Sequence, residues 1–313
     1  MNYFSMFSGI GGFENGIKRA LDNKQSSEVE QDREGRNGDT DEQKVRVLSS
    51  TKPALCVGHS EIDPYAEQVY QKQFGGKNYG DATNINTDEL PDFDMLCGGF
   101  PCQAFSIAGK RRGFDDTRGT LFFEIARIAK AKQPRILFLE NVKGLLNHDK
   151  GNTFTKTLQT LDELGYDVQW QVLNSKHFGV PQNRERVFII GHLRGTRRPE
   201  VFPITRSNNI YLKEITENVS DAQRIYTTDC ANASCLTKGY GKGDNRPNNK
   251  SCRTRIHNGN TIRRLTPTEC ERLQGFPDGF TKGLSDTQRY KCLGNAVTVN
   301  VIEAIWSKYN MKP

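Results

Sequence analysis

The chain has 313 residues, a hydrophobic fraction of 35% and a formal net charge of +7. This length predicts one large core accompanied by a smaller second unit. The sequence lacks a run of about 18 apolar residues and a basic amino-terminal segment that leads into a long apolar stretch, so we expect a soluble cytoplasmic protein rather than a membrane-spanning or exported one.

Alternating apolar runs and amphipathic stretches occupy the first half of the chain. The apolar runs predict strands at residues 3–7, 54–58, 95–98 and 136–139. The amphipathic stretches predict helices at residues 13–21, 65–74 and 121–131. A further helix is expected at 153–164, and further strands at 167–174 and 186–191. The pattern predicts an α/β fold with a mostly parallel, Rossmann-like sheet, helices on both faces, and ligands beyond the carboxyl ends of the strands.

Two changes in composition divide the chain into domains. Residues 1–193 form the expected first domain, interrupted by an insertion at 23–50 that is rich in charged and polar residues and is predicted to be a mobile loop. Residues 194–261 form the expected second domain, which is small, irregular and β-rich. Residues 262–313 are predicted to return to the first domain. Their first helix opens at Thr266 as N-cap, with Pro267 and Glu269 behind it, and their last helix spans 297–309.

The positive charge is concentrated in one part of the sequence. Residues 184–264 contain 16 Lys or Arg and 7 Asp or Glu, an excess larger than the net charge of the whole chain. Such a surface suits a polyanion, because each neutralised phosphate releases counterions. A solvated basic face without a partner is the alternative.

The eight cysteines include no Cys-x-x-Cys pair and do not cluster with the five histidines. We therefore predict neither a metal site nor a disulfide framework, and a reducing compartment. One cysteine stands out by its position. Cys102 directly follows a proline in the loop 98–106, which begins with two glycines after the third expected strand. A thiol on a stiff loop at a strand end is a candidate nucleophile, whereas a buried structural cysteine is the alternative.

A glycine-rich turn follows the first expected strand, where residues 7–14 read Phe-Ser-Gly-Ile-Gly-Gly-Phe-Glu. Glycines let a ligand approach the backbone closely, and the start of the next helix offers free amides. The second expected strand leads to Glu61, at a place where an acid commonly binds a ribose diol. Asp81 is a candidate acceptor for an adenine amino group. A simple tight turn, helix caps and surface charges remain the alternatives.

Further polar groups lie next to the later strands. The fourth expected strand leads into Glu140, and burial there would raise the pKa of this carboxyl and prepare it to donate a proton or hydrogen bond. Arg184 and Arg186 precede another apolar strand and would project to one side of an extended segment, where one of them could reach the same pocket. A loop-capping Glu and an ordinary Arg–Glu pair are the alternatives.

Taken together, these motifs resemble those of the cytosine-5 DNA methyltransferases, in that family's order. The matching segments are residues 7–14, 99–103, 140–142, 182–186, 264–277 and 294–297. The resemblance implies a methyltransferase α/β domain of residues 1–193 and 262–313, with a target-recognition domain at 194–261. It covers nearly the whole chain except the insertion and the basic variable segment.

The resemblance also implies a reaction. Cys102 would add to carbon 6 of a cytosine that is rotated out of duplex DNA. Glu140 would hold ring nitrogen 3 and the exocyclic amine, and Arg186, with Arg184 nearby, would bind the carbonyl oxygen. The activated carbon 5 would then receive the methyl group of S-adenosylmethionine, leaving S-adenosylhomocysteine, without a metal.

The resemblance assigns the remaining candidate residues by position. The implied cofactor pocket comprises Phe7, Ser8, Gly9, Gly11, Gly12, Glu61, Ile62, Asp81, Pro101, Asn295 and Val297. Ile62 replaces a tryptophan of some relatives, so an aliphatic contact would replace adenine stacking. The candidate DNA contacts are Ser106, Lys110, Arg111, Arg112, Arg224, Lys238 and Tyr240. A compact target of about 4–6 base pairs is expected from so small a recognition segment.

Two other functions compete with DNA methylation. One branch of the family methylates transfer RNA and carries a Cys-Phe-Thr triplet, which this sequence lacks, so DNA is favoured. A non-enzymatic nucleic-acid-binding regulator of the same fold is the other alternative, and the presence of Cys102, Glu140 and Arg186 argues against it. We expect a prokaryotic enzyme that is monomeric, with a separately acting restriction endonuclease as its possible partner.

Overall fold

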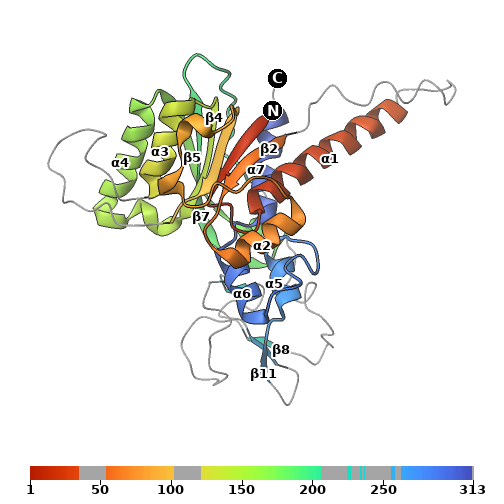
Figure 1. Cartoon of the computed structure of the whole chain (residues 1–313). Coiled ribbons are helices and arrows are strands. Elements are labelled where there is room, and N and C mark those ends of the chain that lie inside the picture. The colour runs from red at the N-terminus through yellow and green to blue at the C-terminus, as the bar shows by residue number, and fades with distance from the viewer. Residues whose placement is uncertain are drawn as a thin grey trace.

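A six-stranded sheet forms the centre of the computed structural model, which describes residues 1–34, 54–101, 121–205, 224–226, 233–234, 236, 255–257 and 262–311 (Figure 1). The strand order is β2-β1-β3-β4-β7-β5, with β1 (Asn2–Met6), β2 (Leu55–Ser60), β3 (Met95–Gly99), β4 (Ile136–Val142), β5 (Tyr166–Asn174) and β7 (Glu185–Leu193). The first four strands in this order run parallel, and β7 is antiparallel to both β4 and β5. The expected mostly parallel sheet is therefore confirmed.

Helices cover both faces of this sheet (Figure 1). The helices α1 (Gly12–Glu34) and α7 (Val299–Met311) pack on one face, and α3 (Leu121–Lys132) and α4 (Asn152–Glu163) pack on the other. Successive strand side chains enter opposite layers because their Cβ atoms alternate. In β4, Phe138 packs with α1 and α7, whereas Leu137 packs with α3 and α4. This two-sided burial explains the continuous apolar runs in the sequence.

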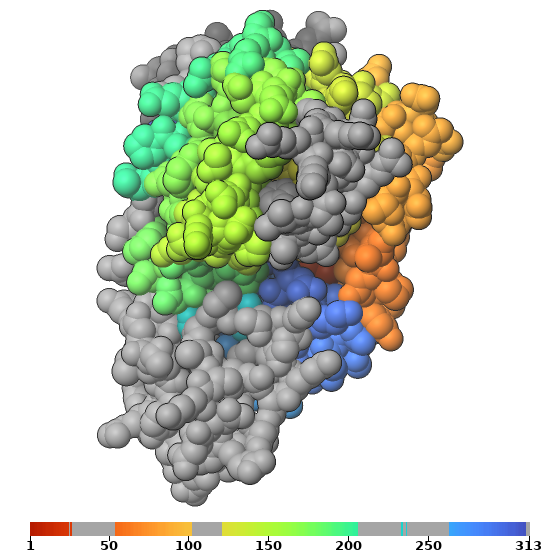
Figure 2. Space-filling model, turned by 90° about the vertical axis from the view of Figure 1, so that its left-hand side faces the viewer, coloured from red at the N-terminus to blue at the C-terminus, as the bar shows by residue number. Residues whose placement is uncertain are grey.

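A third apolar cluster lies below the carboxyl edge of the parallel strands in Figure 1. It joins α2 (Pro64–Gln73), α5 (Pro267–Gln274) and α6 (Asp286–Asn295) to Ile10 of the glycine turn. Figure 2 shows the blue carboxyl-terminal residues directly against the orange residues that include α2. An ion pair of 2.6 Å between Lys291 and Asp63 links α6 to the N-cap of α2. The helices α5 and α6 thus pack against α2 and the glycine turn.

Shorter elements complete the described part of the chain. The short helices are η2 (Ala82–Asn84), η3 (Thr87–Glu89), η5 (Lys143–Leu146), η6 (His148–Gly151) and η7 (Ser175–His177). Three short antiparallel strands, β8 (Arg224–Tyr226), β10 (Arg255–His257) and β11 (Ile262–Arg264), form a second sheet. Two further strands, β6 (Gln182–Asn183) and β9 (Ala233–Ser234), pair in parallel.

The predicted start of α5 is confirmed in detail. The Thr266 hydroxyl accepts from the backbone N–H of Glu269, and the Glu269 carboxylate accepts from the backbone N–H of Thr266. Pro267 occupies the first helical position, where its missing N–H costs nothing. This reciprocal cap fixes the residue at which α5 begins.

The structure differs from the sequence predictions in three segments. Residues 23–34, expected within a mobile loop, continue α1 to Glu34, and residues 35–53 lie outside the described part. The helix α6 was not predicted, because its sequence is polar and contains Gly294. Residues 194–205 were expected to begin the second domain. Instead, Gln169 and Gln171 of β5 bind the backbone of residues 199–204, whose Val201 lies in the core.

One buried histidine predicts how stability depends on pH. His192 in β7 is almost fully buried, and burial, with Arg198 as a second cause, lowers its pKa from 6.5 to about 4. The folded state disfavours protonation of His192, because the folded-state pKa lies below the unfolded-state value. The contribution of neutral His192 to stability is therefore present above pH 6.5 and is lost as the pH falls toward 4. Its size is about 3 kcal/mol. Urea unfolding of wild type and His192→Gln at several pH values should show the wild type losing this much more stability over that range, and parallel pH profiles would contradict the assignment.

Candidate active site

An ion pair between Glu140 and Arg186 lies at the carboxyl end of β4. Arg186 Nε is 2.9 Å from Glu140 Oε1, and the two side chains are only 16% and 12% exposed. The antiparallel register brings them together, because Val142 lies opposite Arg186 across the β4–β7 pair. Gly99 of β3 lies opposite Glu140, and a Cβ at Gly99 would approach Glu140 Oε2 to 2.9 Å. A larger residue in place of Gly99 would therefore displace this carboxylate.

The environment of Glu140 acts on its pKa in opposite directions. Burial raises the pKa of this carboxyl and is the larger effect, whereas the positive charges of Arg186 and Arg184 lower it. The net pKa is above the ordinary value, as the sequence predicted. A group of this kind can hold a proton nearer to neutral pH than a surface glutamate and donate it to a heterocycle.

Asn141 attaches the beginning of the Cys102 loop to β4. Its side-chain amide donates to the carbonyl of Phe100 at 2.9 Å, and its oxygen accepts from the backbone N–H of Val142 at 2.8 Å. The residue is almost fully buried. It therefore holds the chain two residues before Cys102 against the strand that carries Glu140. The sequence analysis gave Asn141 no role, although its position next to Glu140 in the same motif indicated that it lies at the site.

Arg184 and Arg186 make different contacts. The Arg184 side chain is buried, and its guanidinium donates to the carbonyls of Leu236 and Ala296 at 2.8 Å each and of Gly294 at 3.4 Å. Arg184 lies between β6 and β7, where the extended chain is interrupted. Arg186 is thus the arginine in contact with Glu140, whereas Arg184 is bound to the backbone of two other segments.

The glycine turn between β1 and α1 contains three left-handed residues. Phe7, Gly9 and Gly11 have φ values of 52°, 56° and 82°. The backbone N–H of Gly9 donates to Glu61 Oε2 at 2.8 Å, and the other oxygen of Glu61 accepts from the backbone N–H of Ile62 at 2.9 Å. The turn after β1 and the turn after β2 are therefore fixed to each other by one carboxylate.

The glycine turn and the two turns beside it leave open space and exposed groups. A Cβ at Gly9 would meet no atom within 4 Å, and the buried Ser8 hydroxyl has no partner among the described residues. Ile62 follows Glu61 with 72% of its surface exposed. Asp81 caps η2 by accepting from the backbone N–H of Thr83, and these hydrogen bonds lower the pKa of its carboxyl. It is thereby held as an acceptor.

The carboxyl-terminal part of the chain closes the other side of this region. A Cβ at Gly12 would come within 2.6 Å of Val297 Cγ1 and 2.9 Å of the Val297 carbonyl, so only glycine permits this approach. Asn295 is the last residue of α6, directly before the segment that contains Val297. Pro101 is exposed at the end of the described β3 segment. The structure thus places the glycine turn between Glu61 and Val297, two of the predicted cofactor residues.

The remaining candidates cannot be placed in this way. Seven of them lie outside the described residues, namely Cys102, Ser106, Lys110, Arg111, Arg112, Lys238 and Tyr240. For Arg224 the structure describes the backbone of β8.

One buried acid beside the glycine turn was missed. Glu14 in the first turn of α1 is fully buried, and burial raises the pKa of its carboxyl. Tyr70 of α2 donates to Glu14 Oε1 at 2.9 Å. Its position, two residues after the last glycine of the turn, was the available signal. Glu14 therefore connects the start of α1 to α2.

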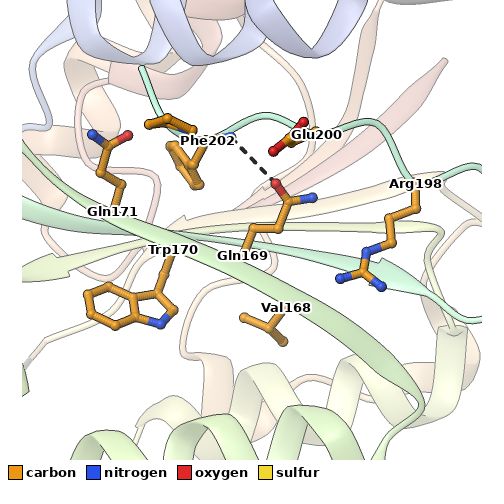
Figure 3. Close-up of a pocket in the computed structure, with 8 residues that line it drawn as sticks. Val168, Gln169, Trp170, Gln171, Arg198, Glu200 and Phe202 are labelled. Carbon is orange, nitrogen blue, oxygen red and sulfur yellow. Dashed lines mark hydrogen bonds between the residues drawn. The ribbon is translucent and has the colours of Figure 1, made fainter. Parts of the chain in front are cut away.

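A shallow depression of about 660 Å³ lies elsewhere, on β5 at the opposite edge of the sheet from β2 (Figure 3). Its lining residues are Val168, Gln169, Trp170, Gln171, Arg198, Glu200, Phe202 and Pro203. Figure 3 shows the Gln169 amide oxygen accepting from the backbone of Phe202, at 3.4 Å. None of the predicted site residues lines it, so we exclude it from the candidate active site.

No group of three or more His, Cys, Asp or Glu suited to a metal ion occurs among the side chains that the structure describes. Within the same residues, no helix is long and apolar enough to cross a membrane.

Comparison with known proteins assigns the chain to a family. The model of the C-5 cytosine-specific DNA methylases matches residues 1–234 and 205–310. The type II methyltransferase M1.ScrFI of Lactococcus lactis subsp. cremoris is 43% identical over 286 residues, which are 82% of this chain and 72% of the relative. M.SsoII of Shigella sonnei is 42% identical over 282 residues, which are 82% and 74% of the two chains.

A solved structure confirms the fold. The crystal structure of S. pombe Dnmt2 methyltransferase superposes with a TM-score of 0.70 at 18% identity, and the match covers 98% of this chain and 97% of that chain. With the family model spanning nearly the whole sequence, the chain belongs to the C-5 cytosine-specific DNA methylases and is a DNA (cytosine-5)-methyltransferase.

Proposed function

We propose that the chain is the methylating enzyme of a type II restriction-modification system and acts on one short duplex sequence. The buried Glu140–Arg186 pair, next to the strand that leads to Cys102, is the observation that carries the catalytic part of this proposal. The names of the relatives M1.ScrFI and M.SsoII support the type II assignment. The partner endonuclease would be a separate protein, and the methyltransferase would act as a monomer in a prokaryotic cytoplasm.

Cys102 supplies the nucleophile. Its thiolate adds to carbon 6 of the target cytosine, and the electron pair of the carbon 5–carbon 6 double bond makes carbon 5 nucleophilic. After carbon 5 has gained a methyl group, loss of its proton restores the double bond and expels the thiolate. Asn141 supports this step by holding Phe100, two residues before Cys102, against β4.

Glu140 and Arg186 bind the polar edge of the base. The Glu140 carboxyl contacts ring nitrogen 3 and the exocyclic amine, and its raised pKa favours donation of a proton to nitrogen 3 as the thiolate adds. Arg186 donates to the carbonyl oxygen, where negative charge develops. The ion pair between the two holds both groups ready before the base arrives.

The family is S-adenosylmethionine-dependent, and the glycine turn fits this cofactor. When bound, the cofactor supplies an electrophilic methyl group on its sulfonium. Glu61 would bind the ribose hydroxyls, Asp81 the adenine amino group, and Ile62 a face of the adenine. Phe7, Ser8 and the glycines 9, 11 and 12 would line the methionine part, with Pro101, Asn295 and Val297 closing the pocket.

The DNA contacts are assigned to two segments. Ser106 and the basic residues 110–112 would meet the flipped nucleotide and its phosphates, whereas Arg224, Lys238 and Tyr240 would reach the grooves. We keep the predicted recognition domain of residues 194–261 but move its start, because residues 194–205 pack on β5. The recognition domain would therefore begin after residue 205.

Transfer of tritiated methyl groups tests the proposal. Wild-type enzyme with labelled S-adenosylmethionine should label duplex DNA and leave transfer RNA unlabelled, and bisulfite sequencing of the product should show one common motif of about 4–6 base pairs. Labelling of transfer RNA alone would overturn the DNA assignment. Scattered methylation without a motif would overturn the type II assignment.

A further inference from the structure

Buried hydrogen bonds hold Leu236 of the recognition segment against residues 182–184, which directly precede Arg186. The Gln182 amide oxygen accepts from the backbone N–H of Leu236 at 3.0 Å, and Arg184 Nη1 donates to the Leu236 carbonyl at 2.8 Å. Both backbone groups of Leu236 are thus bound by two side chains of one short segment. Ala233 adds a third bond, from its N–H to the carbonyl of Pro181 at 2.6 Å. All four groups involved are buried.

Arg184 also binds the segment that closes the cofactor region, and Gln182 is linked to that segment through Gln274. Arg184 Nη2 donates to the Ala296 carbonyl at 2.8 Å. The Gln182 amide nitrogen donates to the Leu273 carbonyl at 2.9 Å, and Gln274, the next residue, donates to the Leu293 carbonyl at 2.6 Å. Ala296 lies between the predicted cofactor residues 295 and 297. One guanidinium therefore bridges the recognition segment and the cofactor segment directly.

Two further contacts make this bridge stiff. Thr298 donates to Gln274 Oε1 at 2.8 Å and shares a hydrogen bond of 2.9 Å with Ser175. On the other side, Gly12 of the glycine turn lies so close to Val297 that no Cβ would fit. A displacement of the 294–298 segment would therefore be transmitted to the glycine turn.

We propose that Gln182 and Arg184 are positioning residues that couple the recognition segment at Leu236 to the cofactor segment at Ala296, so that DNA and cofactor strengthen each other's binding. This inference rests on the cofactor and DNA roles given under Proposed function. The class of ligand at one end is duplex DNA, and at the other a sulfonium or thioether nucleoside.

The coupling follows from the chemistry of a buried guanidinium. Arg184 presents its donors in a rigid planar fork and has little access to water, so a donor that loses its carbonyl stays unsatisfied. Leu236 cannot move away from Arg184 without this cost, and Ala296 is bound by the same fork. DNA that restrains Leu236 would thereby restrain Ala296 through the same guanidinium, and the linkage is reciprocal.

Cofactor affinity measured with and without DNA tests this coupling. The target sequence is first found from the sites that wild-type enzyme methylates in plasmid DNA. Calorimetry then gives the Kd of S-adenosylhomocysteine for free enzyme, for enzyme with a duplex carrying that target, and for enzyme with the scrambled duplex. Wild type should bind at least about fivefold more tightly with the target duplex than without it. The ratio of the Kd without DNA to the Kd with the target duplex measures the coupling. Arg184→Lys, which keeps the charge but loses the planar guanidinium, should bring this ratio close to one.

Two more variants separate coupling from loss of structure. Gln182→Asn shortens the amide that holds Leu236 and should also lower the ratio. Arg194→Lys is the matched control, because Arg194 also binds a carbonyl, that of Asp162 at 3.1 Å, but lies at the far end of the sheet, and its ratio should equal that of wild type.

Three outcomes would overturn the inference. In the first, the wild-type enzyme itself has a ratio of one. In the second, both folded variants keep the wild-type ratio. In the third, the variants lose the same affinity for S-adenosylhomocysteine with and without DNA. A failure of the proposed function is distinguishable, because wild-type enzyme would then transfer no methyl group to the target duplex. If Arg184→Lys fails to fold, the result for Gln182→Asn decides.

Discussion

Glu140→Gln is expected to lower kcat for methyl transfer by about 10²–10⁴-fold. Glutamine matches a protonated glutamate in shape and can still donate a hydrogen bond to ring nitrogen 3, but it cannot deliver a proton. Burial already raises the pKa of the Glu140 carboxyl, so the native group is suited to this delivery. Binding of S-adenosylhomocysteine should change little, because Glu140 lies on β4 and the glycine turn lies beyond β1. Single-turnover kinetics and calorimetry measure the two effects separately.

Glu185→Gln is the matched control for this variant. Glu185 lies on the same strand as Arg186 and pairs with Lys143 at 2.9 Å, with both side chains about half exposed. The same chemical change there should leave kcat within about twofold, since an exposed pair contributes little. Equal losses in the two variants would show that Glu140 has no special role. A Glu140 variant with normal kcat would contradict the proposed proton donation outright.

Glu271→Ala is expected to destabilise the protein by about 3–5 kcal/mol. Glu271 in α5 is fully buried and accepts from the backbone N–H groups of Gly279 and Thr281, the Thr281 hydroxyl, and Arg289 at 3.0 Å. Its removal leaves several buried donors and one cation without their acceptor. Urea unfolding followed by circular dichroism measures the change in unfolding free energy.

The same arginine offers a control. Asp286 contacts Arg289 at 3.9 Å from an exposed position, so Asp286→Ala should cost no more than about 1 kcal/mol. A similar loss in the two variants would mean that burial of the Glu271 network contributes nothing. The comparison also separates stability from catalysis, because neither residue lies in the proposed active site.

Local sequence patterns predicted the sheet well. Apolar runs marked β1 to β4 within about three residues, because strands buried on both faces need apolar side chains throughout. The start of α5 could be predicted equally well, since a capping box is a contact between residues that are three apart in sequence. The pKa direction of Glu140 followed from its place at the end of a buried strand.

The features that failed depend on distant partners. The last turns of α1 are polar, so no apolar periodicity revealed that the helix reaches Glu34. The docking of residues 194–205 depends on the side chains of Gln169 and Gln171, about thirty residues away in sequence. The separate contacts of Arg184 arise because three segments meet around it. No local pattern contains such information.

The covalent bond between Cys102 and carbon 6 of cytosine is tested most directly with a duplex in which 5-fluorocytosine replaces the target base. Fluorine cannot leave carbon 5 as the proton does, so the adduct persists once the methyl group has been transferred. Mass spectrometry of the digested complex should show the peptide containing Cys102 joined to a methylated nucleotide, and Cys102→Ser should give no adduct. An adduct on another residue, or none with enzyme that methylates the unmodified duplex, would contradict the proposed nucleophile.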